Sequence, residues 1–176
     1  PGVEYCDIMG AQHEIPLMVS AYQKGIRNYD VDKAYEAVKK TLTTQGTALS
    51  SGGIVGNRHL DVYLKYGFVP YGEKSHHNVF GTTYEGPTSN TLEYAFDDWN
   101  AAQFAKALGY EEDYDYFTRR AYNYKNVFDS ETKYVRPKYS DGTWMPDFEP
   151  INKDEHSTSW SWLGSGFVEG ISWQYT

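Results

Sequence analysis

Apolar side chains recur at helical spacing through the first part of the chain. One such stretch begins near Gln12 and stops at Gly25. A second runs from Val31 to about Thr44, and Asp30 is placed to cap its N-terminus. Because only a few residues join them, the two helices are expected to form an antiparallel hairpin. The apolar positions that define them are Ile15, Val19, Tyr22 and Ile26, then Ala34, Tyr35, Val38 and Leu42.

The next forty residues alternate between loops and one short helix. Residues 46–56 are rich in Gly, Ser and Thr, which predicts a loop. A short helix is expected from Arg58 to Tyr66, ended by Gly67, and residues 72–87 are expected to be a second loop. This loop contains His76 and His77. Since adjacent side chains do not face the same way on a helix or strand, we do not expect these histidines to bind a metal together.

The longest helical pattern starts with Thr88 or Ser89 as the cap and ends at Gly109. Glu93 and Asp97 are four residues apart and share a face, with Asp98 beside them. Such like charges repel unless a cation or a hydrogen-bond donor lies between them. Two interpretations follow. The carboxylates form either a polar cluster beneath an active site or an acidic helix face that bonds to neighbouring loops.

A further helix is predicted from Tyr110 to about Val127. Arg119 and Arg120 follow Asp113 and Asp115 at spacings that suggest ordinary ion pairs within the helix, which we interpret as structural. Beyond it, the Asp141-Gly142 dipeptide predicts a tight turn. The flanking segments, residues 134–135 and 143–145, are candidate short strands, so this region is expected to be a hairpin lid.

Pairs of amphipathic helices separated by long polar loops predict an all-α fold of stacked helical hairpins. No sequence repeat of fixed period is visible, which argues against a regular solenoid. A toroid of hairpins can gather its loops on one rim, and carbohydrate sites are commonly built from such loops.

The amino-acid composition argues against several classes of function and favours others. The net charge of −8 and the lack of a basic stripe argue against a nucleic-acid partner. The aromatic content of 17% supplies the flat faces on which sugar rings stack. With a single cysteine, Cys6, the chain cannot form an internal disulfide. No apolar run reaches the roughly 18 residues of a membrane span.

The candidate chemistry lies in the last ten residues. There Glu169 precedes a glycine and is followed closely by Trp173, Gln174 and Tyr175. A carboxyl group held among aromatic rings loses solvation, which raises its pKa toward the range of a general acid. The alternative is a surface glutamate in a loop. The chain starts at Pro1 without a Met and stops within this aromatic motif, so we expect it to be an excerpt of a larger protein.

Several runs, taken in order, resemble one enzyme family, glycoside hydrolase family 92, whose members are calcium-dependent exo-acting α-mannosidases. The most specific are Thr91-Leu-Glu-Tyr-Ala-Phe-Asp-Asp-Trp99 and the closing Trp173-Gln-Tyr-Thr176, considered together. Each would be a weak signal by itself. The other matching runs are Tyr22-Gln-Lys-Gly-Ile-Arg-Asn-Tyr-Asp30, Asp32 to Lys40, Tyr66-Gly-Phe-Val-Pro70, Asn123-Tyr-Lys-Asn126 and Arg136-Pro-Lys138.

The resemblance implies that residues 1–176 are a fragment of one (α/α)6 barrel domain, with long loops and room for a small β-hairpin. Complete members carry a β-sandwich domain before this barrel, and here both that domain and the C-terminal remainder of the barrel would be absent. The resemblance further implies an inverting hydrolysis of terminal α-linked mannose, which needs one carboxylic acid and one carboxylate base. The substrate would be a mannose-containing glycan, and the location periplasmic or extracellular.

Glu169 aligns with the general acid in the family motif Glu-Gly-Asn-x-Trp-Gln-Tyr-Thr, which implies that Trp173, Gln174 and Tyr175 surround the substrate. The base would lie beyond Thr176, so the 176-residue chain is expected to be inactive alone. Calcium is the implied cofactor, and its six to eight oxygen ligands cannot be identified here.

One position departs from the family motif, because Ile171 stands where Asn is usual. The departure keeps two other hypotheses open. The protein could bind carbohydrate, or act as a scaffold, without catalysis, or it could be an (α/α)6 glycosidase for another sugar.

Overall fold

The computed structural model describes residues 12–48, 54–75 and 86–146, and within them helices dominate. The α-helices are α1 (Glu14–Gln23), α2 (Val31–Thr43), α3 (Leu60–Tyr66), α4 (Pro87–Leu108) and α5 (Glu111–Ala121). A 3-10 helix, η1 (Tyr122–Val127), continues α5. None of the helices in these ranges is long and apolar enough to cross a membrane.

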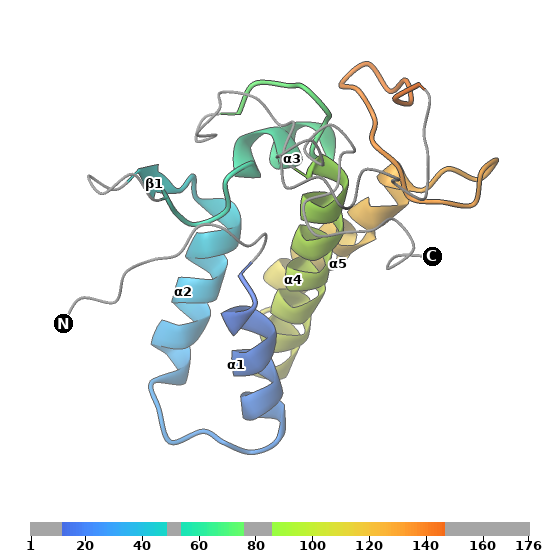
Figure 1. Cartoon of the computed structure of the whole chain (residues 1–176). Helices are drawn as coiled ribbons and strands as arrows, with labels where there is room; N and C mark the ends of the chain where they lie inside the picture. Colours follow the sequence, from blue (N-terminus) through green and yellow to red (C-terminus); the bar gives the residue numbers. More distant parts are fainter. Residues whose placement is uncertain (1–11, 49–53, 76–85, 147–176) are drawn as a thin grey trace, which may run out of the picture.

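Successive long helices run in alternating directions, as Figure 1 shows for α1, α2, α4 and α5. The predicted hairpin of α1 and α2 is therefore confirmed. A local side-chain contact fixes where α2 begins. Asp30 caps α2 by accepting a hydrogen bond from the Lys33 amide at 3.0 Å. Ile26 lies beyond the end of α1 and is 55% exposed, so its predicted place on the apolar face was wrong.

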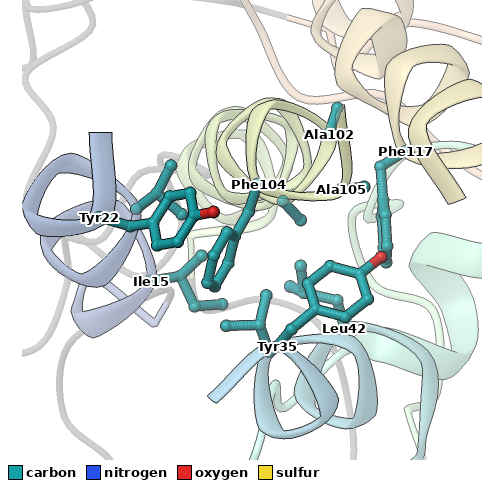
Figure 2. Close-up of a cluster of buried hydrophobic side chains, with 11 residues drawn as sticks. Ile15, Tyr22, Tyr35, Leu42, Ala102, Phe104, Ala105 and Phe117 are labelled. Carbon is teal, nitrogen blue, oxygen red and sulfur yellow. The ribbon is translucent and has the colours of Figure 1, made fainter. Parts of the chain in front are cut away.

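The main core lies where α1, α2 and α5 pack on the C-terminal half of α4. Phe104 of α4 is its centre. The ring of Phe104 meets Tyr22 of α1 with centroids 5.1 Å apart and Tyr35 of α2 edge-on at 5.5 Å. Figure 2 shows Phe104 between these two helices, with Phe117 of α5 beyond. The other buried members are Ile15, Val19, Val38, Leu42, Ala101, Ala102 and Ala105.

α4 begins differently from the prediction. Its N-cap is Gly86, in a left-handed conformation, and Pro87 is the first helical residue, so Thr88 and Ser89 lie inside the helix. The reason is that Pro87 suits the first helical position, where its missing N–H is not needed. Ser89 and Asn90 then donate side-chain hydrogen bonds back to the Gly86 carbonyl, at 3.0 and 2.9 Å.

The loops after the hairpins carry small β elements at one end of the helices (Figure 1). The segment predicted as a loop over residues 46–56 contains two paired strands, β1 (Thr47–Ala48) and β2 (Ile54–Val55). After η1, antiparallel bridges join Phe128 to Val135 and Lys138 to Trp144. The turn at Asp141-Gly142 is confirmed, but Trp144 pairs across it with Lys138 while Val135 pairs with Phe128, so the prediction that residues 134–135 form the other strand of this hairpin was wrong. Whether it acts as a lid stays a prediction.

Gly67 at the end of α3 allows α3 and η1 to pack closely together. Its φ of +73° is left-handed, and a Cβ built on it would lie 3.0 Å from the Asn126 side-chain nitrogen. That nitrogen donates to the Gly67 carbonyl at 2.8 Å, so only glycine allows α3 and η1 to approach this closely.

Candidate functional site

The residues predicted to carry the chemistry lie outside the described part of the chain. Glu169, Trp173, Gln174, Tyr175 and Ile171 all fall within 147–176, and His76 and His77 fall within 76–85. Their roles therefore stay predictions. The acidic group of α4 is described, and it forms a candidate site with its neighbours.

Asp98 of α4 is fully buried in an ion pair with Arg120 of α5. The Arg120 Nη2 atom lies 2.8 Å from Oδ1 of Asp98, and Nε donates to Oδ2 at 3.1 Å. Tyr63 of α3 donates its hydroxyl to the same Oδ2 at 2.9 Å. Burial raises the pKa of Asp98 above its ordinary value, while the Arg120 charge and the Tyr63 hydrogen bond oppose that rise. Arg120 is thus the cation, and Tyr63 the hydrogen-bond donor, that offset the repulsion expected between adjacent carboxylates.

Arg120 extends the network to four helices. Its Nη1 donates to the Leu42 carbonyl near the end of α2 at 2.8 Å and to the Tyr116 hydroxyl at 3.2 Å. Its guanidinium also lies 5.2–5.5 Å from the ring centroids of Tyr63, Tyr116 and Phe117. The planar, multiply bonded guanidinium holds the helices in one register.

The predicted ion pairs within the α5 helix were wrong for Arg120 and Asp113. Arg120 turns inward to Asp98, and Asp113 faces α2 instead, where Lys39 donates at 2.7 Å and Tyr35 at 2.8 Å. Although burial raises the pKa of Asp113, these hydrogen bonds lower it overall. The sequence spacing missed both pairings because each partner belongs to another helix.

Asp97 is also fully buried, but its surroundings differ. Its Oδ2 accepts a hydrogen bond from the Gln12 amide at 2.9 Å, which ties the residue before α1 to the middle of α4. Among the described residues its Oδ1 has no hydrogen-bond partner. Burial raises the pKa of Asp97 to about 7, and the Gln12 amide partly offsets that effect. Asp97 is therefore a carboxyl group whose protonation can change near neutral pH.

Glu93, the third carboxylate, lies nearer the solvent. Its Oε2 is 3.4 Å from Nε2 of His13, and the two side chains are 27% and 55% exposed. The three acidic residues thus do not form one acidic face, because two are buried and bound to other elements. The interpretation of an acidic helix face that bonds to neighbouring loops fits Asp97, which accepts from the Gln12 amide, but was wrong for Asp98, which is bonded to Arg120 of α5 and Tyr63 of α3. A position beneath an active site stays a prediction.

A second set of buried polar groups was not predicted. Asn57, His59 and Thr88 are almost fully buried, and the described residues give no hydrogen-bond partner to His59 Nδ1 and Nε2, Thr88 Oγ1 or the Asn57 amide. Burial lowers the pKa of His59 to about 3, so its ring is neutral. The sequence signal that could have found Thr88 is the polar run at the start of α4, where a core-facing helix would usually be apolar. No comparable signal marks Asn57 or His59.

The described residues do not provide a complete hydrolytic pair or a metal site. An inverting glycosidase needs an acid and a base, whereas here Asp98 is held by Arg120 and Asp97 accepts a hydrogen bond from the Gln12 amide and feels the charge of His13. No group of three or more His, Cys, Asp and Glu that could hold a metal ion occurs in those ranges. What is described is a rigid polar framework.

Comparison with known proteins gives the framework its context. The model of the glycosyl hydrolase family 92 catalytic domain matches residues 2–176. Among solved structures, the GH92 inverting mannosidase BT2199 of Bacteroides thetaiotaomicron VPI-5482 is 32% identical with a TM-score of 0.75, over 98% of this chain and 20% of that protein. The GH92 α-mannosidase BT3965 of B. thetaiotaomicron is 31% identical with a TM-score of 0.71, over 94% and 18%.

A fungal relative agrees with these structures. A protein named an uncharacterized secreted glycosidase, from Arthroderma benhamiae, is 29% identical over 141 residues, which is 73% of this chain and 17% of that protein. The chain thus spans a fifth or less of the length of these relatives. The predicted all-α fold, part of an (α/α)6 barrel, is confirmed by the likeness to the GH92 structures. The chain belongs to glycosyl hydrolase family 92.

Proposed function

We propose that this chain is part of the catalytic domain of a glycoside hydrolase that removes terminal α-linked mannose, with α-1,2 linkages preferred, from glycans by inversion. The observation that supports this most is the family match over residues 2–176, together with a mannosidase neighbour named as inverting. The chain spans only 20% of that neighbour, so the activity proposed is that of a longer polypeptide.

In this proposal Glu169 is the general acid, which donates a proton to the leaving glycosidic oxygen, and a base outside residues 1–176 activates the water. Trp173 and Tyr175 would surround the acid with apolar surface that raises its pKa, and Gln174 would donate hydrogen bonds to substrate or to neighbouring groups.

Calcium is part of the proposal for the longer protein only. Calcium needs six to eight oxygen ligands, and the described ranges contain no group of three or more His, Cys, Asp and Glu that could hold a metal ion. No step is assigned to the ion here. The location is proposed to be periplasmic or extracellular, which the secreted relative supports.

The test is release of mannose from α-1,2-mannobiose by the complete gene product, with calcium and with a chelator. We expect release with calcium and a loss of at least about tenfold with the chelator. A Glu169→Gln variant should lose about 10²–10⁴-fold in turnover of a poorly activated mannoside, the usual contribution of a general acid. Unchanged turnover by this variant would remove Glu169 from the mechanism.

One observation favours a second candidate, a protein that binds mannose glycans without cleaving them. Ile171 replaces the usual Asn two residues after Glu169. Restoring that amide with Ile171→Asn separates the candidates. Binding of mannobiose without release by either form of the complete protein would support the binding role.

A further inference from the structure

Thr88, in the first turn of α4, carries a buried hydroxyl group that is not used by the surrounding described structure. Its side chain is 0% exposed, and its Oγ1 atom has no hydrogen-bond partner in the ranges described. The side chains of Ser89, Asn90 and Thr91 instead donate to carbonyl groups at the start of the helix, at 2.8 to 3.0 Å. Thr88 has no such carbonyl within the helix, because the residues three and four positions before it precede the first helical residue.

A buried hydroxyl without a hydrogen bond opposes folding, and a valine of nearly the same shape would avoid that cost. Buried polar groups without a partner are rare in folded proteins, and functional sites are where such local costs are retained. Thr91 provides the contrast within the same helix. It lies three residues further on and is equally buried, but its hydroxyl accepts from the Val69 amide and donates to the Pro87 carbonyl.

The first turn of α4 offers backbone donors beside this hydroxyl. The first N–H groups of a helix have no partner within it, and the Gly86 N-cap contributes no side-chain hydrogen bond. The partial positive charge of the helix N-terminus favours an oxygen atom in front of it. Figure 1 shows this turn at the end of the long helices where the small β elements lie.

The polar groups of this turn are neutral, which narrows the class of ligand. No charged residue occurs from Pro87 to Leu92. A site for a phosphate or carboxylate usually adds an arginine or lysine to the backbone donors. A hydroxyl group both donates and accepts, so it can match the hydroxyl of a neutral sugar in either sense.

We propose that the Thr88 hydroxyl forms a hydrogen bond with a hydroxyl group of the sugar substrate and thereby contributes to the choice of sugar. This inference rests on the proposed function, since it assigns a residue to recognition of the same neutral hexose. Because the Thr88 side chain is fully buried here, the sugar has to displace the side chains that cover it. Binding is therefore expected to include a local conformational change.

Stability without a ligand gives the first test. In the complete protein, Thr88→Val should leave the melting temperature unchanged or raise it, because a methyl group replaces a hydroxyl that has no partner. Thr91→Val is the matched control and should lower the melting temperature by about two degrees. A decrease for Thr88→Val as large as that for Thr91→Val would show that the Thr88 hydroxyl has a partner in the protein, and would overturn the proposal.

Binding of D-mannose, measured by calorimetry, gives the second test. The monosaccharide cannot be hydrolysed, so it reports binding alone. Thr88→Val should raise the Kd about tenfold, which corresponds to the loss of one buried hydrogen bond. Thr88→Ser keeps the hydroxyl, and Thr91→Val changes a group bonded within the protein, so both should stay within about twofold. Equal Kd values for Thr88→Val and the unsubstituted protein, or no binding of mannose by the latter, would overturn the proposal.

A panel of 2-, 3-, 4- and 6-deoxymannose identifies the sugar hydroxyl involved. The analogue that lacks this hydroxyl should bind the unsubstituted protein about tenfold more weakly than mannose. It should bind Thr88→Val as well as mannose does, because neither pair can form the bond. If each analogue loses the same factor in both proteins, Thr88 does not contact a sugar hydroxyl.

The outcomes separate this inference from the proposed function. Mannose binding that depends on the Thr88 hydroxyl, in a complete protein that releases no mannose from mannobiose, would support the inference while the enzymatic proposal fails. Release of mannose with a KM that Thr88→Val leaves unchanged would support the enzyme and overturn the role of Thr88.

Discussion

The two halves of α4 bury opposite kinds of side chain. Its C-terminal part buries Ala101, Ala102, Phe104 and Ala105 against the apolar cluster, while its first twelve residues bury hydroxyls, an amide and two carboxylates beside Tyr94 and Ala95. The apolar half stabilises by removing surface from water. The polar half gains little net stability from each hydrogen bond and loses much if one partner is removed. In this one helix, the apolar part therefore contributes mainly to stability, and the polar part fixes the positions of the neighbouring elements.

The largest effect is expected in the apolar half. Phe104→Ala should lower the free energy of unfolding by about 4 kcal/mol, because it removes the ring that fills the space between Tyr22 and Tyr35. Urea denaturation measures the change. The loss should be nearly the same at pH 5 and pH 8, since no ionisable group is left unpaired. A strong pH dependence would show that the two halves are not independent.

Arg120→Met should cost about 3 kcal/mol at pH 8, because it leaves the buried Asp98 without its cation. The loss should shrink at pH 5, where Asp98 can be protonated. Denaturation at both pH values measures the difference. Pairing the change with Asp98→Asn should recover much of the loss. If the double variant is no better than Arg120→Met, the ion pair is not the source of the cost.

A neutral hydrogen bond in the polar half should matter less. The Thr91 hydroxyl accepts from the Val69 amide at 2.9 Å and donates to the Pro87 carbonyl at 2.8 Å. Thr91→Val keeps the shape but leaves a buried amide unpaired, which should cost about 1–2 kcal/mol. Thermal unfolding measures this, and Thr91→Ser is the matched control that keeps the hydroxyl. A loss from Thr91→Ser as large as that from Thr91→Val would assign the effect to packing.

The last effect is a change in the pH dependence of stability, which is small over any single pH unit. The pKa of Asp97 is about 7 in the folded chain and lies near its ordinary value when unfolded. Between about pH 4 and 7 the folded state therefore binds more protons, so stability falls as pH rises. The slope due to Asp97 is on the order of 1 kcal/mol per pH unit, and Asp97→Asn should reduce it. A slope unchanged by this substitution would place the pKa of Asp97 outside that window.

The sequence predicted what short-range chemistry decides. Asp30 caps α2, and Gly67 and Gly109 end α3 and α4, because each of these roles depends only on the adjoining helical turn. The Arg120–Asp98 pair joins residues 22 positions apart, and only the packing of α5 on α4 brings them together. Helix spacing favoured a nearby partner and so missed it.

For the candidate site too, the sequence predicted local features and missed those that depend on residues far apart in the chain. Asp97 is buried, which raises its pKa to about 7, and it accepts a hydrogen bond from Gln12, 85 residues away in the chain, so spacing along α4 alone could not predict its surroundings. The family resemblance predicted Glu169 from its adjoining motif, and that residue falls outside the described ranges.

The alternating direction of the helices has an evolutionary consequence. Because the strands β1 and β2 and the hairpin of residues 128–145 lie at the same end of the helices (Figure 1), an insertion in either connection lengthens that end and leaves the Phe104 cluster untouched. Insertions at that end can therefore reshape one rim while the helices keep the same packed core.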